Sequence, residues 1–189
     1  MKKMTLIILI ATLIASLSFA QDQNLDVSAT VGVTALSYTS NTDIAIGDVS
    51  KASTATVDPL SGAAHANVSG TTTAGNIAIS GEEGATITIA FDATAVLGNL
   101  TENMTFTADV VGHSTTHPAS ATSLTSGVST VDLSGTAGGG GTGTYNFWIG
   151  GDLVVGASQS PGAYSTATGN GSGISGNGGG AWSMTLVYQ

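Results

Sequence analysis

The stretch Tyr145–Tyr164, YNFWIGGDLVVGASQSPGAY, decides the fold that the sequence predicts. Gly150-Gly151-Asp152 separates two apolar runs, and glycine adopts positive φ without steric cost. We therefore expect Phe147–Ile149 and Leu153–Val155 to pair as an antiparallel hairpin across this turn. A second turn is expected at Ser160-Pro161-Gly162. The densest aromatic cluster of the chain lies here and is expected to feed one core: Tyr145, Phe147, Trp148 and Tyr164.

Outward from this stretch, apolar residues recur at every second position in short runs joined by polar turns. Such a pattern predicts an all-β protein, an immunoglobulin-like antiparallel β-sandwich, with a barrel as the alternative. The clear runs are Leu25–Val33, Ile87–Phe91, Met104–Val110 and Trp182–Tyr188. Weaker runs are Ile44–Ile46, Thr54–Val57, Ala66–Val68, Ile77–Ile79 and Val128–Leu133. The side chains expected in the core are Phe147, Trp148, Trp182, Leu186, Ile87, Ile89 and Phe106.

The first twenty residues have the composition of a secretory signal peptide. Lys2 and Lys3 precede the apolar run Thr5–Leu17, and Ser18-Phe19-Ala20 supplies the small residues of a cleavage site. We expect residues 1–20 to be a signal and residues 21–189 to form a single β-sandwich domain. The expected location is the periplasm, the cell surface or the extracellular space, with no membrane span in the mature chain.

Charge excludes several classes of partner. Loss of Lys2 and Lys3 takes the formal net charge from −9 to −11 and leaves Lys51 as the only basic residue. A chain without arginine and with one lysine cannot neutralise a row of phosphates, so no nucleic acid is expected as a partner. The absence of cysteine excludes thiol catalysis, disulfide frameworks and cysteine metal sites.

Five pieces of sequence, in this order and spacing, carry a family resemblance. They are TVDP at Thr56–Pro59, SGEEGATITI at Ser80–Ile89, FWIGGDL at Phe147–Leu153, QSPGAY at Gln159–Tyr164 and MTLVYQ at Met184–Gln189. The chain from about Leu25 onward resembles the bacterial secreted family catalogued as domain of unknown function 4402. More distantly it is similar to chaperone–usher pilins and spore-coat-U-like proteins, although it lacks the cysteine pair that many such pilins carry. The resemblance implies an immunoglobulin-like sandwich and no known activity.

The function expected from these features is structural: a subunit of a cell-surface or extracellular, pilus-like assembly whose partners are copies of itself or other surface subunits. The alternative is a monomeric carbohydrate- or surface-binding module, in which Trp148 or Trp182 would stack on sugar rings. The candidate assembly strand is the alternating set Leu25, Val27, Ala29, Val31 and Val33. Two interpretations of this strand stay open: it pairs with a neighbouring subunit's sheet, or it is the first strand of its own domain.

No residue pattern indicates an enzyme, and no cofactor is expected. His113 and His117 have helical metal spacing, but Pro118 places them in a loop, and His65 stands apart. Adjacent Glu82 and Glu83 are expected in a solvated turn, because neighbours in a strand cannot face one substrate. Four acids near expected loops keep calcium as a minority hypothesis: Asp43, Asp48, Asp132 and Asp152. Asp58 is expected to form a turn, and the glycine-rich segments Gly135–Gly143 and Gly169–Gly180 are expected to be mobile connections.

Overall fold

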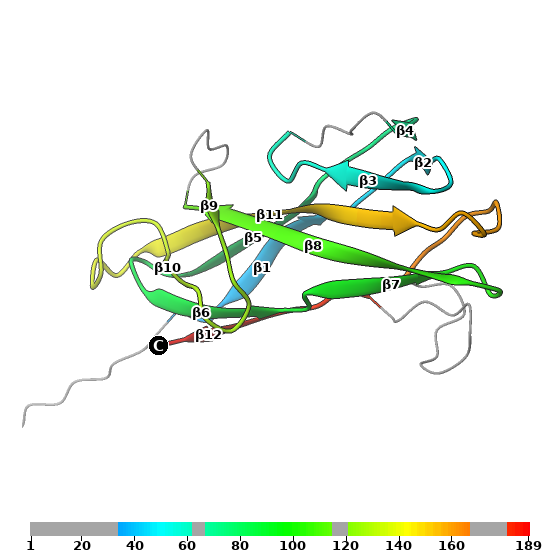
Figure 1. Ribbon diagram of the computed structural model, residues 1–189. Coiled ribbons are helices and arrows are strands. Elements are labelled where there is room, and N and C mark those ends of the chain that lie inside the picture. Colours follow the sequence, from blue (N-terminus) through cyan, green and yellow to red (C-terminus); the bar gives the residue numbers. More distant parts are fainter. Residues whose placement is uncertain (1–33, 62–66, 115–120, 167–180) are drawn as a thin grey trace, which may run out of the picture. The chain divides into compact units, whose positions relative to one another are not determined.

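A computed structural model describes residues 34–61, 67–114, 121–166 and 181–189 (Figure 1). This part of the chain is all β, with no helix, and forms an antiparallel β-sandwich as the sequence predicted. Since it holds no helix, none of its segments qualifies as a long apolar helix able to cross a membrane. The strands are β1 Ser37–Thr42, β2 Asp48–Val49, β3 Ser53–Val57, β4 Val68–Ser69, β5 Gly75–Glu82, β6 Thr86–Phe91, β7 Thr94–Gly98, β8 Asn103–His113, β9 Thr122–Ser123, β10 Thr130–Asp132, β11 Thr142–Val155 and β12 Met184–Tyr188.

The strands form a large sheet, a small sheet and a separate two-stranded ribbon. The large sheet has the order β1-β5-β11-β8-β7, with β3 also paired to β11 and β9 to β8. The small sheet has the order β10-β6-β12, and the ribbon joins β2 to β4. One core cluster lies between the two main sheets, since it combines Ile79 and Phe147 of the large sheet with Ile87 and Ile89 of the small one.

β11 is one continuous strand of 14 residues, so the predicted hairpin across Gly150-Gly151-Asp152 is wrong. Along one side of β11, β5 pairs with Thr142–Ile149 and β3 pairs with Gly151–Val155. Gly150 and Gly151 lie at the point along β11 where its neighbouring strand changes from β5 to β3. A Cβ at Gly150 would lie 2.2 Å from the backbone oxygen of Val57, so the missing side chain lets the end of β3 approach.

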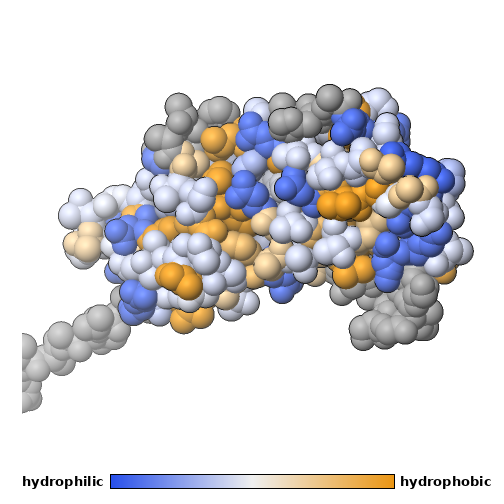
Figure 2. Space-filling view, viewed as in Figure 1, coloured by the Kyte–Doolittle hydropathy of each residue, from blue (hydrophilic) through white to orange (hydrophobic). Residues whose placement is uncertain are grey.

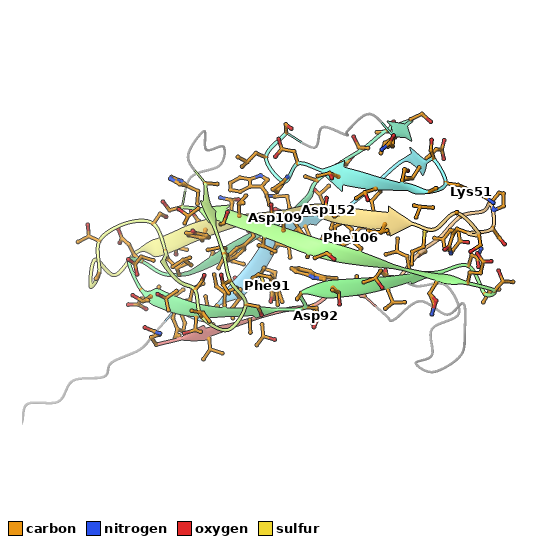
Figure 3. The ribbon with its side chains drawn as sticks, viewed as in Figure 1. Lys51, Phe91, Asp92, Phe106, Asp109 and Asp152 are labelled. Atoms are coloured by element: carbon orange, nitrogen blue, oxygen red, sulfur yellow. The ribbon has the colours of Figure 1, made fainter. Side chains whose placement is uncertain are left out.

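The chain passes between the sheets without a long loop after β6. β6 pairs with β12 in the small sheet, and only Asp92-Ala93 separates it from β7, which pairs with β8 in the large sheet. Figure 3 labels Phe91 and Asp92 at this junction. The small sheet therefore ends at the junction, and the inner face of the large sheet beyond it is covered by segments outside that sheet, among them Ile44–Val49.

The expected core is confirmed for most positions, and two positions are less buried than the others. Phe147, Ile87, Ile89 and Phe106 are buried, and Trp148 is also buried with 9% of its surface exposed. Trp182 and Leu186 are only partly buried, although both pack against core residues. Both lie in or just before β12, the strand at the edge of the small sheet.

Candidate functional site

One edge of β12 has no strand beside it in the described part of the chain. On its other edge β12 pairs with β6, where Asp92 N donates to Ser183 O and Gln189 N donates to Thr86 O. In an antiparallel pair the residues that exchange backbone bonds alternate along the strand. The odd-numbered residues of β12 therefore face β6 with their backbone groups. The even-numbered residues Met184, Leu186 and Tyr188 direct their backbone N–H and C=O groups to the open edge.

The apolar side of β12 packs against the core but is not fully covered. Met184, Leu186 and Tyr188 are partly buried, while Val187 on the opposite side is 58% exposed. Sheet edges are usually protected from further pairing by charges, proline or bulges. β12, with the sequence MTLVY, carries no charge and no proline, and its pairing with β6 has no bulge. The open edge is thus chemically suited to accept another strand.

β1 is the edge strand of the large sheet on the same side. All six of its residues are exposed, including Tyr38 at 58%, and a register shift interrupts its pairing with β5 between Tyr38 and Ser40. The Tyr38 hydroxyl donates to the backbone oxygen of Met184 over 2.9 Å. Because this side-chain bond replaces a backbone ladder between β1 and β12, their backbones lie farther apart than the ~4.8 Å of paired strands.

Hydrogen bonds of the Tyr188 hydroxyl hold other segments at one end of the open edge of β12. This hydroxyl accepts a hydrogen bond from Glu82 N at 2.6 Å and donates to Thr34 O at 2.6 Å. Thr34 N donates in turn to the Glu82 carboxylate at 2.8 Å. A Cβ at Gly81 would lie 2.3 Å from the Tyr188 hydroxyl, so glycine at position 81 leaves the space for it. The described chain therefore begins fixed at the Tyr188 end of β12.

We expect Tyr188→Phe to lower the free energy of unfolding by about 1–3 kcal/mol, since it removes both bonds and leaves the partly buried backbone N–H of Glu82 unpaired. Tyr38→Phe is the matched control, because it removes one exposed bond and should cost less than about 1 kcal/mol. Urea denaturation of both variants measures the difference. Equal costs at the two positions would contradict the assigned role of Tyr188.

A cleft of about 990 Å³ opens at the other end of β12. Its lining combines side chains from β7, β8 and β11 with the segment after β1 and with Trp182 just before β12. The indole N–H of Trp182 donates to Asp92 O at 2.5 Å, and the Trp182 ring centroid lies 5.9 Å from that of Phe91. The apolar lining includes Ile44, Ile46, Leu97, Met104, Phe106, Leu153 and Val155. The open edge of β12 and this cleft are joined through Trp182.

One wall of the cleft is held by Glu102. Its carboxylate accepts from Ser160 N at 2.6 Å, from Ser160 Oγ at 2.9 Å and from the Tyr164 hydroxyl at 3.1 Å. Ser160 and Tyr164 belong to the QSPGAY segment, which lines the cleft. The backbone bond from Ser160 lowers the pKa of Glu102 below its ordinary value, with further lowering by the Ser160 and Tyr164 hydroxyls and by the charge of Lys51, against a raising effect of burial.

The anchoring of this wall is expected to weaken in acid. A carboxyl whose pKa is lower in the folded state stabilises the fold above its unfolded pKa, and that contribution is lost as pH falls through the folded pKa. Glu102→Gln should therefore lower the melting temperature at pH 7, and the difference from wild type should shrink as the pH falls below the ordinary range of a glutamate. Ser160→Ala should show a smaller loss of the same sign. A difference that stays constant with pH would contradict this assignment.

The acids considered for calcium do not form a site. Asp48, Asp132 and Asp152 lie on β2, β10 and β11, and only Asp43 lies in a loop. Asp152 accepts a hydrogen bond from Thr56 across to β3, and Asp132 accepts one from Thr86 of β6. No group of three or more potential metal ligands occurs among the described residues.

The segment Gly135–Gly143, whose last two residues begin β11, has an anchor that the sequence did not indicate. The Glu83 carboxylate accepts from Thr136 N and from Gly141 N, each at 3.1 Å. A Cβ at Gly135, Gly139 or Gly141 would lie within 2.5 Å of Glu83. The glycines therefore let the loop close around Glu83, which stands in a turn as expected, whereas Glu82 is the last residue of β5.

Of the remaining candidates, Asp58 is confirmed, His113 lies in a strand and not in the expected loop, and the others are undescribed. Asp58 forms the expected turn by accepting from Leu60 N at 2.9 Å and Ser61 Oγ at 2.7 Å. His113 is the last residue of β8. The other histidines, the glycine-rich segment and the candidate assembly strand lie outside the described residues: His65, His117, Gly169–Gly180, Leu25, Val27, Ala29, Val31 and Val33.

The comparison with family models decides what kind of domain this is. The model of the family described as domain of unknown function (DUF4402) matches residues 36–170. The chain belongs to this family. The DUF4402 match includes TVDP, SGEEGATITI, FWIGGDL and QSPGAY, while β12 follows the matched range. No curated protein and no solved structure matches the chain.

The described residues on the face of the DUF4402 domain that carries β8 and β11 form a mixed polar and apolar surface. Figure 2 shows its apolar residues in separate areas with hydrophilic residues between them. Val154, which is 62% exposed, stands on β11 beside the exposed Asp152. The open edge of β12, the Tyr188 anchor and the cleft therefore form the candidate site.

Proposed function

We propose that the protein is a secreted structural or interaction protein, a subunit of a cell-surface or extracellular, pilus-like assembly, and that it has no catalytic role. The observation that carries this proposal is the open edge of β12, where an uncharged strand with a partly exposed apolar face stands at the border of the small sheet. Edge strands of this kind bind extended segments through backbone hydrogen bonds and side-chain contacts. The resemblance to secreted surface proteins points the same way.

The state of association of the mature protein tests the proposal. Purified residues 21–189 should give a ladder of oligomers under mild denaturation. Light scattering should show the average mass rising with protein concentration. A protein that stays monomeric at high concentration would rule out self-assembly.

A second candidate is a monomeric carbohydrate- or surface-binding module. Trp182 favours it, because this partly buried indole lines the cleft together with the polar side chains of Asn41, Asp43 and Gln159. An aromatic ring beside hydrogen-bonding groups suits the apolar faces and hydroxyls of a sugar. Isothermal titration with soluble polysaccharides should then detect binding that Trp182→Ala abolishes. Trp148→Phe is a poor probe of this cleft, since Trp148 is buried and lies outside its lining.

A further inference from the structure

We infer that the open edge of β12 accepts the segment Leu25–Val33 of a second copy of this chain as an added strand. The inference rests on the proposed assembly function and names the partner for the same site. It accounts for the incomplete burial of Leu186, an expected core position. Met184, Leu186 and Tyr188 share one face of β12, and each of them is only partly buried. A strand beside β12 would cover the open edge next to these three side chains.

The dimensions of the open side fit one strand. The backbone groups of Met184, Leu186 and Tyr188 that face it form the repeating set that a neighbouring strand bonds. The Tyr38 hydroxyl now takes the Met184 oxygen, so an added strand would displace one exposed hydrogen bond. Leu25–Val33 is nine residues long and would extend about 30 Å. This length covers β12 and reaches the cleft beyond Trp182.

The low charge of Leu25–Val33 makes it a better partner for β12 than the rest of a second, acidic copy. Mature chains carry a formal charge of −11 each and repel one another. Val27–Val33 contains no charged residue, and its side chains Val27, Ala29, Val31 and Val33 share one face of a strand. β12 is uncharged as well. Asp26 is the only acid of the Leu25–Val33 segment, so Val27–Val33 can approach the uncharged strand β12 with no carboxylate of its own.

The partner is inferred to be a second copy, because Thr34–Leu36 do not form the turn that would bring the chain's own segment back beside β12. For its own segment to lie beside β12, the chain would have to fold back between this strand and β1, which begins at Ser37. Tight hairpin connections need a residue with positive φ. None of Thr34–Leu36 has positive φ, and Thr34 is bonded through both its N–H and its C=O. Leu36 is also packed against the core.

Hydrogen exchange of the full mature chain tests the inference residue by residue. As the protein concentration rises, the amides of Leu186 and Tyr188 should exchange at least about tenfold more slowly, since a new strand bonds them. The amides of Thr185 and Val187 bond to β6 and should be protected at every concentration. This alternation in the response distinguishes strand addition from general burial of the surface.

Paired variants separate the apolar face of the segment from its opposite face. Val27→Asp with Val31→Asp should abolish both oligomers and the concentration-dependent protection. Ser28→Asp with Thr30→Asp adds the same charge on the other face and should retain both. Thermal unfolding checks that all proteins are folded.

The outcomes separate this inference from the function on which it rests. If oligomers form but the Val27→Asp, Val31→Asp protein still assembles and the β12 amides stay unprotected, the inference is overturned and the assembly function stands. If the β12 amides are protected equally at all concentrations in a monomer, the segment is an intrachain strand and both are overturned.

Discussion

Replacing Gly151 with alanine is expected to lower the free energy of unfolding by about 2–6 kcal/mol, because backbone strain and overpacking each cost about 1–3 kcal/mol. Gly151 has a φ of 140°, in a region that side-chain-bearing residues rarely adopt. A Cβ there would lie 2.0 Å from the backbone oxygen of Thr107 and 2.9 Å from the Phe106 ring. Since β8 pairs with β11 at this point, the added methyl group would push two central strands apart.

Two further glycine variants make the measurement specific. Gly150→Ala would place its Cβ 2.2 Å from Val57 O and is expected to disturb the pairing of β3 rather than that of β8. Gly156→Ala is the control just after β11, where the nearest heavy atom lies 3.7 Å away, and its cost should be below about 0.5 kcal/mol. Urea denaturation compares the three. A Gly151→Ala protein as stable as Gly156→Ala would contradict the close packing of β8 on β11.

Gly150 and Gly151 show why part of the fold could not be predicted from the sequence. A Gly-Gly pair between apolar runs suits a tight turn and equally suits a close approach of neighbouring strands. Only the partners decide between them, and Val57 and Thr107 are each more than 40 positions away in the sequence. The alternation itself was reliable, since it placed Ile87, Ile89 and other core residues correctly.

An edge strand and a strand that follows a change of sheet escaped prediction for a related reason. β1 has the sequence SYTSNT and is exposed on both faces, so no periodicity marks it. β7 is short and starts two residues after β6 ends, so Ile87–Leu97 reads as one region although it serves two sheets. A strand that changes sheets, or one that stands at an edge, is defined by its neighbours rather than by its own pattern.

The candidate site was not predicted from the sequence, whose candidate assembly strand, Leu25–Val33, lies outside the described residues. The sequence indicated a strand at each end of the chain and a tyrosine near the end, but not the contact of Tyr188 with Thr34 and Glu82. Glu102 carried no signal, because its partners Ser160 and Tyr164 are distant in the sequence. Hydrogen bonds between distant loops follow from the fold and leave no local spacing to detect.

The second large effect is expected at Phe106, which is 3% exposed and packs in the core cluster that lines the cleft. Phe106→Ala should lower the free energy of unfolding by about 3–5 kcal/mol, the usual cost of deleting a buried phenylalanine. Leu186→Ala deletes an apolar side chain that is only partly buried, so we expect it to cost about 1–2 kcal/mol in the monomer, below the usual range for buried leucine. Chemical denaturation at low protein concentration measures both costs.

The costs of Phe106→Ala and Leu186→Ala should also be measured at high protein concentration. Phe106 is already buried within one chain, so the cost of Phe106→Ala should not depend on concentration. Leu186 would become covered when a second copy adds its strand, and the cost of Leu186→Ala should then rise into the range of about 2–5 kcal/mol typical of buried leucine. A Leu186→Ala cost that equals the fully buried value already in dilute protein would mean that β12 is covered within its own chain.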